Sequence, residues 1–425
     1  MSEQHPTSLH HTAPASEKPT TFAQPDPVSQ GLLQQTLRTQ LNELLAGVTT
    51  EEERLVKLRQ SFTDIANTIL SEKEVAYETL LKQFETLYEN AMLSLKQADI
   101  PEQLLTQQFI SKNGLIMSPL NCSNTIKDVF RVSSFTRGLL RAIEQQLESK
   151  ETVRVLYPAC GTFAPLIVPL LSYVKEHQQI THEQLKVTFV DLQPGAIKAL
   201  KQLVSDLELE EYIDDIVMAD ATEYEPDFTV DILLLEAMQH GFGKEAHLSI
   251  AHHLIRFLDI NGTMVPNRIV INSALVVGAE EFKEQWQDVE YSHSKTVSQE
   301  YMDRRVELGS VMSIDKNSLM QMEKITLSDD QQLIRGATIN IPTGIEDIAK
   351  RTLILYASIQ TFANESIHQY DSGITSPLPD TSICIDFKPR DPRPGDLLVS
   401  SGDDIAFFYR LNGLPGFMPV LESQQ

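Results

Sequence analysis

The stretch VRVLYPACGTF, residues 153–163, decides the fold, because it joins a short apolar run to a turn that contains a glycine. Three further runs follow it, each succeeded by a helical or loop segment: LKVTFVDL (185–192), IVMAD (216–220) and VDILLLE (230–236). Short β-branched or leucine-rich runs that alternate with helices indicate a parallel sheet with right-handed βαβ crossovers, as in an α/β, Rossmann-like fold. Ligands bind such sheets outside the carboxyl ends of the strands, so the residues that close each run form the candidate site.

The segments on either side of these runs have different patterns. Residues 1–29 are rich in Ser, Thr, Pro, His and Gln, which predicts a disordered tail. A helical domain is predicted over 30–118, because apolar residues recur there at helical spacing and Thr50 and Glu53 have the spacing of a capping box. This domain would pack on the rest of the chain, or it would mediate dimerisation or form a lid over the substrate. After 271, short strands broken by Pro and Gly predict a mostly antiparallel, barrel-like β domain over 272–425. The Rossmann-like domain is then 119–271.

Composition limits the class of protein. The 425 residues include 41% apolar and 22% charged side chains, as in globular proteins, and are enough for two or three domains. With 35 Lys and Arg against 59 Asp and Glu, the net charge of −24 disfavours nucleic-acid and membrane partners and suits a cationic substrate. Three widely spaced cysteines predict neither a disulfide framework nor a metal site, and the N-terminus lacks a secretory signal, so we expect a cytoplasmic protein.

Three strand ends carry groups suited to a nucleoside. The first ends at Ala159-Cys160-Gly161, where a single glycine would equally suit a plain packing turn. Asp191 closes the second run and can accept hydrogen bonds from two ribose hydroxyls, or can cap the helix that begins near Pro194. The third run ends at Asp220-Ala221-Thr222, where a side-chain acceptor and a backbone amide could hold an adenine.

The remaining candidates carry charge or a titratable ring. Glu236 closes the fourth run, and Glu245 follows nine residues later. Two carboxylates that face one pocket would hold a guanidinium or an amine, although a solvated Glu245 is equally compatible with the sequence. His240 lies between them and could accept a proton, but an exposed loop histidine is the simpler interpretation. Upstream, Arg131 follows Asp128 by three residues, so it could bind a carboxylate or only pair with Asp128.

In their order, these features resemble class I S-adenosylmethionine-dependent methyltransferases over residues 126–271, and more narrowly the protein arginine methyltransferases. Asp128, Arg131 and Phe135 match the spacing of the helix that precedes the first strand in that group, and Glu236 and Glu245 match its double-glutamate loop. The loop and strand FLDINGTMVPNRIVI (257–271) are also similar, with an expected turn at Asn261-Gly262 and an expected strand that holds Pro266.

The resemblance implies roles for individual residues. Arg131 would bind the methionine carboxylate of the cofactor, Asp191 the ribose and Asp220 the adenine. The glycine motif of the family matches Ala159, Gly161 and Phe163. Two of its three glycines are therefore replaced, which could obstruct the approach of the cofactor to the backbone.

Two further positions depart from the family. Tyr157 stands where its members carry an acid at the end of the first strand. The Thr-His-Trp loop is missing, because the single tryptophan, Trp286, follows Gln285, which argues against a peptidyl-arginine substrate but not against a small cationic molecule. The polar segment HQYDSGIT (368–375) could reach over the pocket, but an ordinary hairpin or loop is the simpler interpretation, so we leave it outside the predicted site.

We therefore expect an S-adenosylmethionine-dependent methyltransferase that methylates a nitrogen of a small guanidino or amino compound, without a metal and compatible with a homodimer. The alternative is a non-catalytic relative that serves as an interaction or regulatory scaffold. A nicotinamide-dependent oxidoreductase is disfavoured, because the chain lacks a complete G-x-G-x-x-G turn. The predicted cofactor-binding residues are Arg131, Ala159, Gly161, Asp191, Asp220 and Ala221, and the predicted catalytic residues are Glu236, Glu245 and His240.

Overall fold

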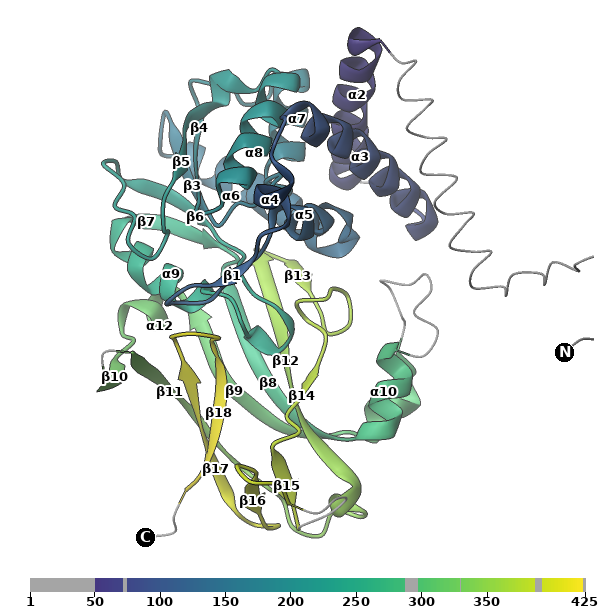
Figure 1. Cartoon of the computed structure of the whole chain (residues 1–425), viewed down its shortest axis with the longest axis vertical. Coiled ribbons are helices and arrows are strands. Elements are labelled where there is room, and N and C mark those ends of the chain that lie inside the picture. The colour runs from purple at the N-terminus through teal and green to yellow at the C-terminus, as the bar shows by residue number, and fades with distance from the viewer. Residues whose placement is uncertain (1–49, 72–74, 287–296, 329, 387–391, 423–425) are drawn as a thin grey trace, which may run out of the picture. The chain divides into compact units, whose positions relative to one another are not determined.

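The computed structural model describes residues 50–71, 75–286, 297–328, 330–386 and 392–422 (Figure 1). The predicted tail (1–29) and the first predicted helical stretch (32–45) lie outside these residues. Residues 1–53 and 54–425 form two separate units. In the described part of the chain, none of the helices has the length and apolar character that a membrane span requires.

A five-stranded parallel sheet forms where the alternating pattern predicts one. Its strands lie in the order β5-β4-β3-β6-β7, and every neighbouring pair is parallel. Three of them, β3, β4 and β6, are buried along nearly their whole length, which explains why their sequences are continuously apolar rather than alternating. The four predicted strands are thus confirmed, and the strands are β3 (Val153–Pro158), β4 (Leu185–Asp191), β5 (Ile213–Met218), β6 (Val230–Leu234) and β7 (Leu258–Val265).

The chain crosses the sheet in two directions from its centre. From β3 it proceeds to β4 and β5 on one side, and it then returns to β6 and β7 on the other side. The connections that follow β3 and β6 therefore diverge, and such a switch point leaves a crevice at the carboxyl edge of the sheet. This places the predicted site residues around one crevice.

Helices accompany this sheet and precede it in the chain. The capping box at the start of α2 is confirmed, because the backbone N–H groups of Thr50 and Glu53 each donate to the other side chain, at 3.1 and 3.2 Å. Pro194 occupies the first turn of α8, as predicted. The helices are α2 (Glu51–Leu70), α3 (Tyr77–Gln97), α4 (Glu102–Thr106), α5 (Pro119–Cys122), η1 (Ser123–Lys127), α6 (Val129–Leu147), α7 (Val168–His177), α8 (Pro194–Asp206), η2 (Glu210–Tyr212), η3 (His240–Phe242), α9 (His247–Leu254) and η4 (Ile255–Phe257).

A short hairpin, β1 (Phe109–Ile110) with β2 (Leu115–Ile116), lies within the stretch predicted to be helical. It is anchored on the loop after β6, since the N–H of Leu115 donates to the carbonyl of Lys244 at 2.8 Å. A Cβ on Gly114 would lie 2.8 Å from the backbone nitrogen of Ala246, so the hairpin can approach this loop only with glycine there.

The C-terminal region is mostly antiparallel, as predicted. One sheet has the order β13-β12-β8-β9, with β14 also on β12, and a second has the order β10-β11-β17-β18. The predicted boundary at 271 falls inside β8, and the division into four domains stays a prediction. The elements are β8 (Arg268–Val277), α10 (Gly278–Trp286), α11 (Gln299–Asp303), β9 (Val306–Asp315), α12 (Lys316–Met320), β10 (Lys324–Ser328), β11 (Gln331–Asn340), η5 (Ile348–Lys350), β12 (Arg351–Phe362), β13 (Glu365–Ile367), β14 (Leu378–Pro379), β15 (Ile383–Ile385), β16 (Leu397–Val399), β17 (Asp404–Arg410) and β18 (Gly416–Leu421).

The predicted turn at Asn261-Gly262 is wrong, as is the prediction of a strand that holds Pro266. β7 continues through residues 261–262, and Pro266 lies between β7 and β8. Gly262 is needed for a close approach instead, because a Cβ there would lie 2.9 Å from the carbonyl oxygen of Asp231. Pro266 has no N–H to donate to a ladder, so the link between two strands suits it better than a strand interior.

Helix α6 joins the parallel sheet to the antiparallel one. Its N-terminal end carries Arg131, and its middle contacts β12, where the Ser134 and Thr361 hydroxyls lie 3.0 Å apart. A Cβ on Gly138 would lie only 2.8 Å from Oγ1 of Thr361, so glycine permits this close contact. One helix is therefore fixed to both sheets.

Candidate functional site

A cavity of about 600 Å³ opens at the carboxyl ends of β3 and β6, where the switch point predicts a crevice. A narrower cavity of about 90 Å³ adjoins it at the ends of β4 and β5. Six predicted site residues line the larger cavity: Arg131, Ala159, Gly161, Glu236, His240 and Glu245. Asp191, Asp220 and Ala221 line the narrower one, and the walls shared by both are Met117, Cys122, Ala159, Gly161 and Glu245. The structure therefore brings all nine predicted residues to one connected space.

Arg131 is the centre of a buried charge cluster. Its Nε donates to Oδ2 of Asp128 at 3.1 Å, and its Nη1 donates to Oε2 of Glu236 at 3.1 Å. Its Nη2 forms an ion pair with the same Asp128 oxygen at 3.0 Å. The exposed fraction is 13% for Arg131, 13% for Asp128 and 6% for Glu236. Arg131 therefore does not form merely a surface pair with Asp128, which was one of the two alternatives that the sequence allowed. Burial alone would lower the pKa of Arg131, but Glu236 and Asp128 together raise it, so the guanidinium stays charged.

Both glutamates line the cavity, and the pKa of each is raised. Burial raises the pKa of Glu236, and Arg131 offsets this effect only in part. Burial, together with the nearby Glu236, raises the pKa of Glu245 to about 7. The interpretation of Glu245 as a solvated residue is therefore wrong. Near neutral pH, Glu245 exchanges a proton easily, as a general base or acid must.

His240 lies on the wall of the larger cavity rather than in an exposed loop. Burial lowers its pKa, and the positive charges of Lys244 and Arg131 lower it further, so the ring is neutral at physiological pH. A neutral imidazole beside a carboxyl that titrates near pH 7 gives the cavity two groups that can accept a proton.

Asp191 and Gly161 are coupled at the junction of the two cavities. Oδ2 of Asp191 accepts from the N–H of Gly161, and its Oδ1 accepts from the N–H of Gln193, both at 2.8 Å. Gln193, and not Asp191, is the N-cap residue of α8, so the capping role considered from the sequence is wrong. Burial raises the pKa of Asp191, against the effect of these hydrogen bonds. Each carboxylate oxygen keeps a lone pair for a further donor.

The degenerate glycine motif does not close the cavity. Ala159 has a left-handed φ of 49° and so adopts the conformation for which glycine is preferred, at a cost of about 1–2 kcal/mol. Phe163 is 1% exposed, packs in the hydrophobic core and is not among the described residues that line either cavity. The expectation that these two residues obstruct backbone approach therefore does not hold for Phe163, and Ala159 contributes only a methyl group to the wall.

A row of hydrogen-bonded polar groups lies at one end of the narrow cavity. Oδ1 of Asp220 accepts from the N–H of Thr222 at 2.8 Å and from its hydroxyl at 2.7 Å. Nδ2 of Asn113, in the β1–β2 hairpin, donates to the hydroxyl of Thr222 at 2.9 Å. Asp220 keeps acceptor capacity beside Ala221, at the place where the sequence predicts an adenine.

Sequence reasoning left out two groups of lining residues. The segment 368–375, interpreted as an ordinary loop, does reach the cavity: Gly373 and Ile374 line it, and the hydroxyl of Ser372 donates to Oδ2 of Asp128 at 2.5 Å. The density of polar residues in this segment was a usable signal. Cys122 also lines both cavities, and burial, with the charge of Asp191, raises the pKa of its thiol so that it stays neutral.

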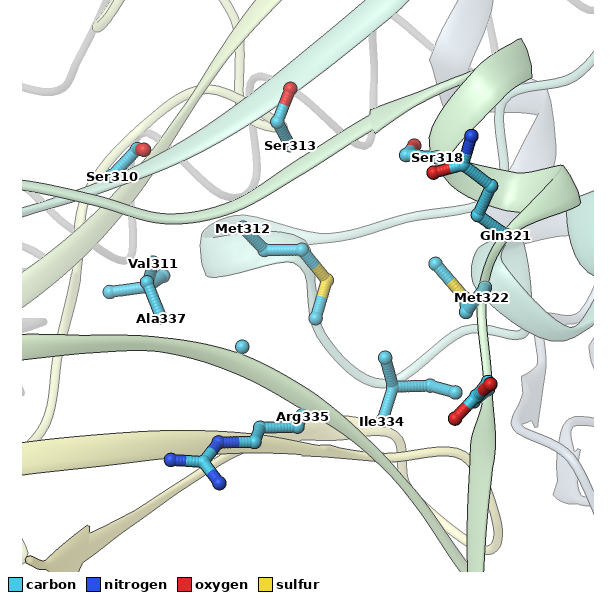
Figure 2. Close-up of a pocket in the computed structure, with 12 residues that line it drawn as sticks. Ser310, Val311, Met312, Ser313, Ser318, Gln321, Met322, Ile334, Arg335 and Ala337 are labelled. Carbon is cyan, nitrogen blue, oxygen red and sulfur yellow. The ribbon is translucent and has the colours of Figure 1, made fainter.

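Another cavity, of about 450 Å³, lies between β9, α12 and β11 (Figure 2). Its wall is mixed: Met312, Met322 and Ile334 supply apolar side chains, and serines with Gln321 supply polar ones, as Figure 2 shows. Arg335 at its edge pairs with Glu422 at 3.1 Å, and both side chains are half-exposed. This cavity lacks the converging buried charges of the switch-point cavity, which is therefore the candidate active site.

Fold and site together define an α/β protein with a charged cavity at the switch point of a parallel sheet, joined to antiparallel sheets. No protein-family model and no curated protein matches the chain. Among solved structures, it is similar to a chain of the Trypanosoma brucei PRMT1 enzyme–prozyme heterotetrameric complex with AdoHcy. The identity is 16% and the TM-score 0.42, over 70% of this chain and 92% of that chain.

Proposed function

We propose that this protein is an S-adenosylmethionine-dependent methyltransferase that acts on a nitrogen of a small cationic molecule. One observation carries the proposal. Nine residues from separate segments, each with a role predicted from its place in the chain, line one connected space at the switch point. A scaffold without a ligand would have no need for buried charges that converge on a cavity, because their burial costs stability.

The residues present fit the cofactor. Within the described part of the chain, two of the five N–H groups of Arg131 donate to Asp128 and Glu236, which leaves others for the carboxylate of a bound amino acid. A Cβ on Gly161 would meet only Cβ of Cys122, at 3.6 Å, so the backbone here is open to a close ligand. Asp191 would accept from the ribose hydroxyls, and Asp220 with the backbone at Ala221 would hold the adenine.

The cofactor would supply a methyl group already activated on a sulfonium, so the protein mainly has to align the acceptor for in-line transfer. Glu236 and Glu245 would orient the cationic acceptor by charge-assisted hydrogen bonds. Glu245, with its pKa raised to about 7 by burial and by Glu236, would take the proton that the acceptor nitrogen releases. His240 is a second neutral acceptor on the same wall.

The non-catalytic alternative loses its main support in the structure. It was motivated by the replaced glycines, yet Phe163 points into the core and Ala159 adopts the glycine conformation. The cavity therefore keeps its volume. A guanidino or amino compound remains our proposal for the acceptor, because the three acidic groups of the lining outnumber its Lys and Arg side chains, which are Lys127 and Arg131.

Calorimetric titration with S-adenosylmethionine and with S-adenosylhomocysteine tests the cofactor assignment. We expect saturable binding near micromolar, or about 8 kcal/mol. Asp191→Ala should weaken it by about tenfold or more, the value of a charge-assisted hydrogen bond. Asp227→Ala, an exposed acid outside the two cavities, is the matched control and should leave binding unchanged. Lack of saturation at millimolar ligand, in protein whose circular dichroism shows a folded chain, would refute the proposal.

A further inference from the structure

A fourth cavity, of about 540 Å³, has a basic lining in a chain whose net charge is −24. Four basic side chains come together in it from different elements: His252 and His253 from α9, Arg256 from η4 and Lys324 from β10. Among the described residues that line it, none is acidic. Because the chain has 59 Asp and Glu against 35 Lys and Arg, a lining with basic and without acidic side chains differs from the composition of the chain as a whole.

Several donors in this cavity are available to a ligand. In the part of the chain that the structure describes, Nζ of Lys324 has neither a hydrogen-bond nor an ion-pair partner. His252 makes a single long contact, 3.4 Å from Nε2 to the carbonyl of Met322. Ser249 adds a largely buried hydroxyl to the wall. Unlike the side chains of the surface ion pairs, these groups keep hydrogen-bonding capacity for a ligand.

The other two basic groups hold the wall in place. Nε2 of His253 lies 2.8 Å from the carbonyl of Tyr224, and its Nδ1 lies 3.3 Å from Nη2 of Arg256. The same Nη2 donates to Glu225 at 2.8 Å, a pair that is more than half exposed and therefore weak. Arg256 keeps N–H groups that this pairing does not use.

The positive charges lie close enough to interact. Burial lowers the pKa of His252, and the charges of Lys324, His253 and Arg256 lower it further, against a hydrogen bond to Met322. Mutual repulsion of this kind, without a carboxylate in the lining, favours an anion between the groups.

We propose that this cavity binds a phosphate-bearing small molecule, held by Lys324, His252 and Arg256. A point-charge ammonium, an imidazole and a planar guanidinium fork from different elements, with the hydroxyl of Ser249, suit the several oxygens of a phosphate group. The volume lies within the range of small-molecule sites. The site is distinct from the proposed methyl-transfer cavity and goes beyond that function.

The basic cavity adjoins the narrow cavity of the proposed cofactor site. Asn113 and Thr222 line both it and the narrow cavity at the ends of β4 and β5. These two side chains are joined by a hydrogen bond of 2.9 Å and lie where the two cavities adjoin. A ligand in the basic cavity would therefore contact Thr222, whose N–H and hydroxyl donate to Asp220.

Titration of the full-length protein with pyrophosphate, followed by calorimetry at low and at raised salt, tests the proposal. We expect saturable binding that weakens as salt increases. Lys324→Gln should weaken it by about tenfold, because it removes a charge-assisted donor. His252→Gln should also weaken it, because a bound anion offsets the neighbouring positive charges and so favours the protonated imidazole, in which both ring nitrogens donate. Lys201→Gln, an identical substitution at an exposed lysine on α8 away from the cavity, is the control and should have no effect. Lys324→Arg, which keeps the charge, should retain most of the binding.

Three results would overturn the proposal. One is the absence of binding at millimolar pyrophosphate in folded protein. Another is equal weakening by Lys324→Gln and Lys201→Gln, which would show only non-specific attraction. The third is saturable binding of citrate without binding of pyrophosphate, which would assign the cavity to carboxylates. None of these results depends on whether the protein transfers methyl groups.

Discussion

The substitution Glu245→Gln should stabilise the protein, and the gain should depend on pH. Burial and the nearby Glu236 raise the pKa of Glu245 to about 7. In the unfolded chain the pKa of a glutamate is about 4.3. The folded protein therefore binds the proton more tightly than the unfolded chain does. The free energy of unfolding should accordingly fall as the pH rises from about 4.3 to about 7.

The size of this effect follows from the shift. One pKa unit corresponds to about 1.4 kcal/mol, so ionisation of Glu245 above pH 7 costs the native state up to about 4 kcal/mol. Glutamine has nearly the same shape and cannot ionise, so it removes this cost. We expect Glu245→Gln to be more stable than the native protein by up to about 4 kcal/mol at pH 8, and nearly equal to it at pH 4.

Urea denaturation at a series of pH values, followed by circular dichroism, measures this difference. Glu225→Gln is the matched control, because this glutamate is 67% exposed and should change stability by less than about 0.5 kcal/mol at every pH. A gain of the same size at pH 4 and pH 8 would show that packing, and not ionisation, is responsible. A loss of stability at pH 8 would refute the account of the buried carboxyl.

Three other substitutions test the surrounding structure. Arg131→Met should lower the free energy of unfolding by about 3–5 kcal/mol, because it leaves Asp128 and Glu236 buried without a counter-charge. Arg335→Met, which breaks a half-exposed pair, should cost less than about 1 kcal/mol, and equal losses would contradict the buried cluster. Ala159→Gly should raise stability by about 0.5–1 kcal/mol by relieving the left-handed φ; a lower melting temperature would argue against that strain. Gly138→Ala should cost about 1–3 kcal/mol by crowding Thr361, whereas Gly416→Ala, with open space around its Cβ, should cost much less.

Local pattern was sufficient to predict the parallel sheet and the residues at its edge. Strands buried on both faces are continuously apolar, and the parallel arrangement brings the residues that close them to one edge. Asp191 and Glu236 could therefore be placed from the sequence, because each directly follows an apolar run. The turn expected at Asn261-Gly262 failed, since a glycine that permits close contact has the same signature as a glycine in a turn.

The state of Glu245 could not be predicted in this way, because distant segments hold its loop. The hydroxyl of Tyr409 on β17 donates to the carbonyl of Phe242 at 3.0 Å, and the N–H of Lys244 donates to the carbonyl of Pro415 at 2.7 Å. These partners lie far along the chain from the loop, so no local pattern reports them. The same is true of Ser372, whose contact with Asp128 depends on tertiary structure alone.

The contact between α6 and β12 gives the antiparallel sheet a mechanical role at the site. Seven residues separate Gly138, which packs against Thr361, from Arg131, and at 1.5 Å per residue this is a lever of about 10 Å. A tilt of about 5° at the contact would move the backbone of Arg131 by about 1 Å, a displacement large enough to impair the alignment of reacting groups. The antiparallel sheet thus fixes the position of Arg131 through α6, although the sheet itself does not contact the reacting groups.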